Sequence, residues 1–187
     1  MADLAAAREN MVESQVRTAD VTDLRIQDAM RALPRETFVP PAKTYLAYAD
    51  IEVEYAPGRW LLKPRDVAKL LQALRPMAGE RALAVAAPYA AAVLERIGLD
   101  VVRIEDPHLP PSGAFDVIVC EGAVGRAPQA WQAAIAEGGR LGVVERDGPV
   151  GKASLYLRAQ DGVGRRELFD STPPVLAGME VQHGFAF

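Results

Sequence analysis

The chain has 187 residues and a formal net charge of −4, from 21 Lys and Arg against 25 Asp and Glu. This length and a half-apolar composition suit one globular domain that needs no disulfide or metal to fold. The acidic balance, without a Lys/Arg-dense stripe, argues against nucleic acid as a partner. The longest uncharged run, residues 82–94, is too short to span a membrane, and charges near the start argue against a signal peptide. We therefore expect a cytoplasmic protein.

Cysteine and histidine are too few to build a metal site. Cys120 is the single cysteine, which excludes an internal disulfide framework, and His108 and His183 do not form a spaced ligand pair. Cys120 stands in an apolar run, where a lone cysteine is expected to be an inert core residue. The stretch from Asp106 to His108 contains a proline and is interpreted as a turn rather than an acid–base pair.

The first third of the chain is predicted to be helical. Apolar residues recur at helical spacing from Leu4 to about Val16 and again as far as Leu33, with Thr22 as the expected cap of the second helix. Phe38 and Val39, set between prolines, are expected to anchor this segment to the core. Residues 51–64 read as irregular around a Pro57-Gly58 turn, and a helix over 65–74 ends before Pro76.

After residue 76 the pattern alternates between strands and helices. Strands are predicted at 82–87, 101–104, 115–120 and 140–144, with helices at 89–97 and 127–137, the latter closed by Gly138-Gly139. Such alternation indicates a largely parallel sheet. The residues that follow predict a hairpin, 154–158 with 163–169, around Asp161-Gly162, and a final edge strand at 181–187. We expect one domain over 1–187, with a helical cap (1–75) on a shortened α/β core (76–187) that ends in antiparallel strands.

Several motifs in order resemble one known family. They are Met-Val-Glu-Ser-Gln-Val-Arg at 11–17, Ala-Met-Arg-Ala-Leu-Pro-Arg-Glu-Thr-Phe-Val-Pro at 29–40 and Tyr-Ala-Asp at 48–50, followed by FDVIVCEGA and EGGRLGVV further on. The chain is similar in these stretches to the protein-L-isoaspartate O-methyltransferase family. The resemblance implies a Rossmann-like fold and methylation of isoaspartyl side-chain carboxylates with S-adenosylmethionine as donor.

The donor-binding turn departs from the family pattern. The family has an acidic residue and a Gly-x-Gly-x-Gly-Tyr turn after its first strand, because glycine lets the backbone approach the ligand closely. Here the turn is shorter and holds no glycine. Ala84 replaces the acidic residue, Ala86 and Ala87 carry Cβ atoms, and Pro88 stands in place of the last glycine. We interpret Ala86, Ala87 and Pro88 as vestigial donor positions.

The adenosine side of the site is also shortened. Glu105 ends a predicted strand, where the family's ribose-binding acid would stand. Only residues 106–114 separate it from the next strand, too few for the helix and strand that the family places there. Glu121 follows Cys120 at the carboxyl end of a central strand, where open α/β sheets place their sites. Glu105 and Glu121 are therefore vestigial cofactor-binding candidates.

The acceptor side has lost its hydroxyl groups. The family carries a Thr-Ile-Ser-Gln-Pro-like segment, and the matching residues here are Trp60, Leu61, Leu62, Lys63 and Pro64. Leu62 stands where the family has serine and Trp60 where it has threonine. We identify no catalytic residue, and interpret Trp60, Leu61 and Leu62 as packing on the core, lining a pocket, or forming a contact surface.

These losses lead to a functional hypothesis with two alternatives. The first is a non-catalytic binding or assembly protein without a cofactor, acting as a homodimer or with a protein partner. Its contacts would be the Trp60–Leu62 segment and an edge strand near Phe185 and Phe187. The alternatives are an active S-adenosylmethionine-dependent carboxyl methyltransferase with an atypical donor site, and a sensor of a smaller ligand.

Overall fold

The computed structural model describes residues 3–181 of the chain. At its N-terminal end, helix α1 (Leu4–Met11) continues through a π-helical turn into a 3-10 turn that ends at Ala19. Helix α2 (Leu24–Ala32) follows. Its cap is Asp23, whose carboxylate accepts the Arg25 N–H at 3.0 Å, so the assignment of the cap to Thr22 was wrong. The Thr22 N–H donates instead to Gln72, at 2.7 Å, which ties this loop to a later helix.

The segment expected to be irregular contains a hairpin. Strands β1 (Val53–Ala56) and β2 (Arg59–Leu61) pair antiparallel across the Pro57-Gly58 turn, where Gly58 has a φ of 68°. Strands of three or four residues are too short to leave a clear alternation in the sequence. The turn was predicted correctly, and the strands on either side of it were missed.

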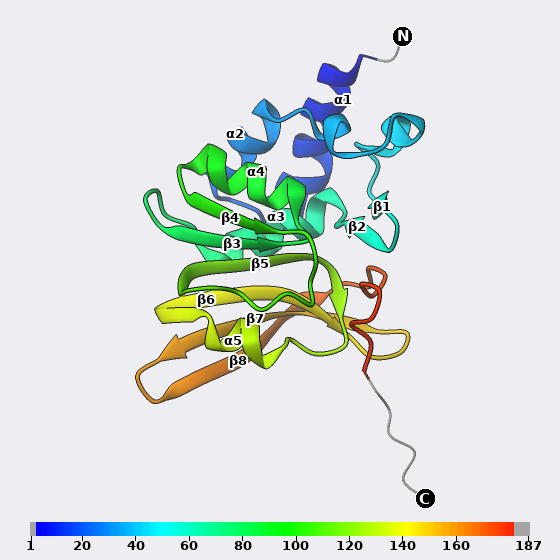
Figure 1. The fold of residues 1–187 in the computed structure, drawn as a ribbon. Coiled ribbons are helices and arrows are strands. Elements are labelled where there is room, and N and C mark those ends of the chain that lie inside the picture. Colours follow the sequence, from blue (N-terminus) through cyan, green and yellow to red (C-terminus); the bar gives the residue numbers. More distant parts are fainter. Residues whose placement is uncertain (1–2, 182–187) are drawn as a thin grey trace, which may run out of the picture.

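One six-stranded sheet forms the centre of the molecule (Figure 1). Its strands are β3 (Arg81–Val85), β4 (Asp100–Ile104), β5 (Phe115–Val124), β6 (Ile135–Arg146), β7 (Gly151–Ala159) and β8 (Gly162–Asp170). The order is β4-β3-β5-β6-β7-β8, parallel from β4 to β6 and antiparallel from β6 to β8. The predicted mostly parallel α/β fold with an antiparallel end is confirmed.

Two predictions for the C-terminal half, the helix over 127–137 and the edge strand over 181–187, are compared with the structure next. The expected helix over 127–137 is only α5 (Gln129–Ala133), because β6 already begins at Ile135, where it pairs with Phe115. The Gly138-Gly139 pair lies within β6, in the stretch where its register with β5 shifts, and not at a helix end. Val181 belongs to no strand, and the rest of the predicted edge strand, including Phe185 and Phe187, lies outside the described residues.

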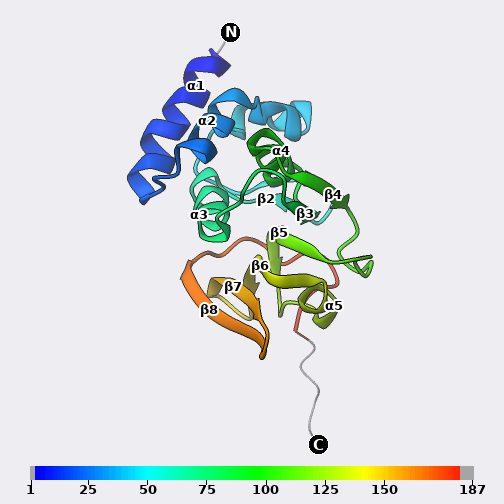
Figure 2. The same cartoon turned by 90° about the vertical axis from the view of Figure 1, so that its left-hand side faces the viewer.

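The two faces of the sheet are covered very differently. Helices α3 (Pro64–Leu74) and α4 (Pro88–Ile97) bury one face, with α2 and α1 packed behind them (Figure 2). The opposite face is covered by the short α5 and by the segment of residues 172–180. Residues 105–114, between β4 and β5, contain no helix, as expected from the small number of residues in this link. Among the described helices, none has the length and apolar character needed to cross a bilayer.

Candidate functional site

The candidate site lies at the carboxyl edge of the parallel strands. In open α/β sheets, ligands bind in the crevice beyond this edge. Strands β3 and β4 end there at Val85 and Ile104, beside Cys120 in β5 (right-hand side of Figure 1). Ala86, Ala87 and Pro88 follow β3 and Glu105 follows β4, whereas Glu121 lies within β5, directly after Cys120. The Ala86 N–H donates a hydrogen bond to the carbonyl of Ile104, the last residue of β4, at 2.8 Å.

The turn after β3 keeps a glycine-like backbone but is filled by side chains. Ala86 has a φ of 44°, in the left-handed region that glycine adopts freely and that strains other residues. Ala86 is fully buried and Ala87 is 2% exposed, so their methyl groups are packed inside the protein. Pro88 is the first residue of α4, a position that suits its fixed φ.

Glu121 reaches from β5 to the start of α4. Its Oε2 accepts the N–H groups of Tyr89 and Ala90, each at 3.1 Å. The first N–H groups of a helix are a ready anion-binding position, so a carboxylate of the chain itself takes that position here. Glu121 is fully buried, and burial raises its pKa to about 7, against the opposing effects of Arg35 and these backbone donors.

Arg35 completes a buried polar cluster around Glu121. Its Nε donates to the Ala47 carbonyl at 2.9 Å and its Nη2 to the Leu62 carbonyl at 2.5 Å. The guanidinium lies 4.5 Å from the centre of the Tyr89 ring, which is edge-on to Phe38 with the centroids 5.4 Å apart. Within the described residues Arg35 Nη1, Tyr89 Oη and Glu121 Oε1 are buried without hydrogen-bond partners. Electrostatic attraction between Arg35 and Glu121 partly offsets this.

Arg35 and Tyr89 were not among the predicted site residues. One signal was available: Arg35 lies close in sequence to Phe38 and Val39, the predicted core anchor, and a charge that is carried into the core must be compensated there. Tyr89 gave no comparable signal, because an aromatic residue at the start of an apolar helix usually belongs to the core.

The acceptor segment packs on the core. Leu61 and Leu62 are fully buried, so the interpretation of these two residues as an exposed contact surface was wrong. Leu61 is the last residue of β2 and Leu62 follows it, with the Leu62 carbonyl accepting a hydrogen bond from Arg35 Nη2. Trp60, one residue earlier, is half-buried. The first of the readings offered for this segment, packing on the core, is therefore confirmed for Leu61 and Leu62.

Glu105 stays apart from the Glu121 cluster. It is exposed, and its Oε2 lies 3.3 Å from Arg59 Nη1 and accepts the Tyr55 hydroxyl, also at 3.3 Å. Both partners come from the β1–β2 hairpin. Asp106 accepts the His108 N–H at 3.0 Å, which confirms the predicted turn. Cys120 is fully buried, and burial raises the pKa of its thiol, consistent with an inert core residue.

A segment that the sequence did not single out crosses this same edge. The Leu176 N–H donates to the Ala123 carbonyl at 2.8 Å, and the Ala123 N–H donates to the Pro174 carbonyl at 3.0 Å. Leu176 is 1% exposed and belongs to the same buried cluster as Val85 and Ala86. It packs so closely on Gly122 that a Cβ there would lie 2.8 Å from the leucine Cδ2. Figure 1 shows this segment, coloured red, beside the tip of the β1–β2 hairpin.

The cavity that remains at the carboxyl edge is small. A cavity of about 250 Å³ lies between the hairpin tip, the Asp106–His108 turn and the pair Leu176-Ala177. Within residues 3–181, no group of three or more metal-binding side chains is gathered in one place.

Comparison with solved structures defines the class of fold. A protein-L-isoaspartate O-methyltransferase structure superimposes with a TM-score of 0.71 at 19% identity, covering 92% of this chain and 67% of the other. A putative enzyme of the same name from Plasmodium falciparum, in complex with S-adenosyl-L-homocysteine, gives 0.75 at 15% identity, covering 90% and 97%. At these identities the likeness establishes the fold alone: the chain has a Rossmann-like methyltransferase fold.

Sequence comparison then establishes the family. Residues 6–106 match the family model described as protein-L-isoaspartate(D-aspartate) O-methyltransferase. A protein-L-isoaspartate O-methyltransferase of Methylorubrum extorquens (strain PA1) is 34% identical over 95% of this chain and 91% of its own length. A relative of the same name from Methylorubrum populi is 32% identical over 93% and 97%. The chain belongs to the protein-L-isoaspartate O-methyltransferase family.

The residues at the edge can be compared with what S-adenosylmethionine requires. A ligand that approaches the backbone closely needs room beside the first turn, and here the Ala86 and Ala87 methyl groups are buried in that turn. A ligand carboxylate at a helix N-terminus needs free N–H groups, and at α4 those of Tyr89 and Ala90 are bonded to Glu121. As the structure has them, the turn after β3 and the first residues of α4 therefore do not fit S-adenosylmethionine.

Proposed function

We propose that this chain is a non-catalytic member of its family, a cytoplasmic binding or assembly protein that uses no S-adenosylmethionine. The observation that carries the proposal is the Glu121 carboxylate, which bonds the first N–H groups of α4 from inside the protein. An anion supplied by the chain itself competes with any ligand anion at the same donors. The partner would be another protein or a second copy of the chain.

Two further features of the carboxyl edge support the proposal. The turn after β3 buries two methyl groups where the family has glycines, and Leu176 fills the space beside Gly122. These features come from different parts of the chain and act on the same edge. Reopening it for a donor would require moving the 172–180 segment as well as changing the turn.

The acceptor side supports the same reading. Methyl transfer needs an oriented carboxylate held in line with the donor methyl. The segment matching the family's hydroxyl residues holds Leu62 here, which is fully buried. An aliphatic side chain in that position offers no hydrogen bond to orient a substrate carboxylate.

Ligand binding is the direct test. Calorimetric titration with S-adenosylmethionine and with S-adenosylhomocysteine, together with thermal unfolding, should show neither saturable heat nor a shifted midpoint. A ligand at about 100 times its Kd stabilises by roughly 2.7 kcal/mol, which corresponds to about 5–11 °C for a domain of this size. The Methylorubrum extorquens relative, titrated in parallel, is the matched comparison. A saturable shift of that order in this chain would contradict the proposal.

A second experiment tests catalysis itself. The chain at high concentration is incubated with an isoaspartyl peptide and methyl-labelled S-adenosylmethionine, and release of labelled methanol from the peptide ester is measured. We expect a rate equal to the protein-free blank. Turnover above it would show an active methyltransferase with an atypical donor site.

A further inference from the structure

A second cavity, far from the carboxyl edge, lies between α3 and the edge strand β8. Its volume is about 660 Å³, against about 250 Å³ for the cavity at the carboxyl edge. It is bounded by the loop before α2, one side of α3 and the end of β8; Figure 2 shows α3 above β8 in this region. We call it the α3–β8 groove. Its charged lining residues are Asp20, Asp23, Arg25, Lys69, Arg75 and Arg166.

The groove is positively charged in a protein of net negative charge. Four of its lining side chains are cationic and two are carboxylates, while the whole chain carries −4. The Asp23 carboxylate is already paired with Arg25, at 2.6 Å. Lys69, Arg75 and Arg166 form no ion pair with any carboxylate in the described part of the chain. Their charge is therefore available to an anionic ligand.

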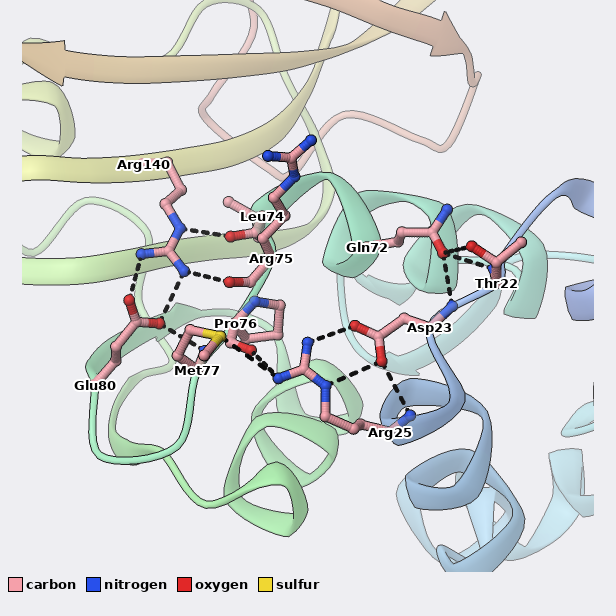
Figure 3. Close-up of polar contacts among 10 residues, drawn as sticks. All are labelled: Thr22, Asp23, Arg25, Gln72, Leu74, Arg75, Pro76, Met77, Glu80 and Arg140. Carbon is pink, nitrogen blue, oxygen red and sulfur yellow. Dashed lines mark hydrogen bonds and ion pairs between the residues drawn. The ribbon is translucent and has the colours of Figure 1, made fainter.

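Arg75 occupies a backbone position where glycine is the usual residue. It follows the last residue of α3 with a φ of 46°, in the left-handed region. Its carbonyl is held by Arg140, whose Nη2 donates at 2.6 Å. In Figure 3 the Arg75 guanidinium extends away from this network and takes no part in it. A strained position that holds a long cation with no internal partner is a reason to ask what the cation binds.

The walls of the groove are held in place by hydrogen bonds. The side-chain oxygen of Gln72 accepts the N–H groups of Thr22, at 2.7 Å, and Asp23, at 3.0 Å (Figure 3). Arg25 Nη1 donates to the Pro76 carbonyl at 2.9 Å, which connects the start of α2 to the end of α3. The groove is thus largely preformed, which lowers the entropic cost of binding.

The floor of the groove favours an extended polypeptide over a small anion. It includes Leu168 and Phe169 of β8, with Lys69 Nζ 4.9 Å from the centre of the Phe169 ring. Strand β8 is at the edge of the sheet, so a further strand can pair with its outer side. Apolar contacts and backbone hydrogen bonds serve a peptide, and the flanking cations serve its carboxylates.

We propose that the α3–β8 groove binds an extended acidic segment of a partner protein, with its carboxylates on Arg75, Arg166 and Lys69. This proposal rests on the proposed function, because the α3–β8 groove would be the surface through which a non-catalytic binding protein contacts its partner. The donor titration tests the loss of S-adenosylmethionine binding separately, so either proposal can fail while the other stands.

The test uses a fluorescein-labelled peptide of alternating Glu and Val, with a peptide of alternating Lys and Val as the charge-reversed probe. Fluorescence anisotropy on the full chain should show saturable binding of the acidic peptide, weakened by added salt, and none of the basic peptide. Arg75→Gly and Arg166→Gln should each weaken binding by about two- to fivefold. Together they should weaken it by about tenfold if the sites act independently.

The variants are chosen so that loss of binding cannot be confused with unfolding. Arg75→Gly places glycine at a left-handed φ, so the fold should be retained, and thermal unfolding checks this. Arg96→Gln removes an exposed cation from α4, outside the groove, and should leave the peptide affinity unchanged.

Three outcomes would overturn the proposal. The first is no saturable binding of the acidic peptide at millimolar concentration. The second is binding that Arg75→Gly and Arg166→Gln leave unchanged. The third is binding of inorganic tripolyphosphate that depends on these two residues while the acidic peptide fails to bind, which would assign the groove to a small anion.

Discussion

The carboxyl edge of the sheet and the α3–β8 groove each contain a residue other than glycine in the left-handed conformation. At the edge it is Ala86, with a φ of 44°, and its methyl group is buried. The groove has two, Asp20 with a φ of 62° and Arg75 with a φ of 46°; Arg75 is exposed, and its guanidinium takes no part in the hydrogen bonds drawn around it in Figure 3. The edge is where this fold class places ligands, yet its backbone donors are bonded to Glu121. The fold therefore determines where a ligand site can lie, and the side chains of the individual protein determine whether that site is open to a ligand.

The largest effect is expected from Leu62→Ser, which restores the family's hydroxyl at the closed edge. Leu62 is fully buried, so the change removes a core side chain and buries a hydroxyl group. The free energy of unfolding should fall by about 4–6 kcal/mol. Urea denaturation followed by circular dichroism measures this.

The control for Leu62→Ser is Leu109→Ser. Leu109 is 55% exposed in the link between β4 and β5, so its loss should cost less than about 1 kcal/mol. If Leu62→Ser were equally mild, the acceptor segment would be a loosely packed surface, and the contrast between a closed edge and an open groove would be weakened.

Leu176→Ala tests the segment that crosses the edge. Leu176 is 1% exposed and packs on Gly122, so truncation should cost about 2–4 kcal/mol. Hydrogen exchange should rise first at the Leu176 and Ala123 N–H groups, which bond β5 to this segment. Leu109→Ala serves as the exposed control. Exchange that rises uniformly over the sheet would mean that the segment does not open separately.

Periodic elements were predicted well because their signal is local. Helices α3 and α4 form within a residue of their predicted ranges, and β3, β4 and β5 appear where short apolar runs stood. The errors lie where contacts distant in sequence decide. The range 127–137 has helical spacing, yet Ile135 pairs with Phe115 and starts a strand. The order of apolar and polar residues within 127–137 cannot predict this pairing, because Phe115 lies outside that range.

The sequence predicted where the candidate site lies in the fold, but not which residues form hydrogen bonds with one another there. Glu121 was identified because it follows the predicted strand 115–120, but its bonds to Tyr89 and Ala90 join residues about 30 positions apart. The α3–β8 groove was missed altogether, since Arg75 and Arg166 meet only through the packing of α3 on the sheet. Leu61 and Leu62 were offered as a contact surface because apolar residues in a loop give no sign of their burial.

The pH dependence of stability tests Glu121 directly. Its pKa is raised from an ordinary value of 4.5 to about 7 by burial, so the folded state binds a proton that the unfolded state has lost between these values. Stability from this group is therefore present at low pH and is lost as pH rises from about 4.5 to 7. The loss should be on the order of 2–3 kcal/mol.

Glu121→Gln isolates this contribution, since glutamine keeps an acceptor for the Tyr89 and Ala90 N–H groups without a charge. The variant should be less sensitive to pH over this range, and at neutral pH its stability should equal or exceed that of the parent. Urea denaturation at intervals from pH 4.5 to 7.5 measures both. Parallel curves for the two proteins would show that Glu121 does not titrate in this range.

The smallest effect is expected from glycine substitutions at Arg75 and Ala86, and it sharpens the comparison between their regions. Arg75→Gly relieves backbone strain at an exposed helix end, where the side chain makes no internal ion pair, so the free energy of unfolding should rise by about 0.5–1 kcal/mol. Ala86→Gly relieves similar strain but removes a buried methyl group, worth about 1 kcal/mol, so its net effect should be near zero. Thermal unfolding of both variants beside the parent measures the difference. A loss of stability in Arg75→Gly would mean that the guanidinium stabilises the fold and is not free for a ligand.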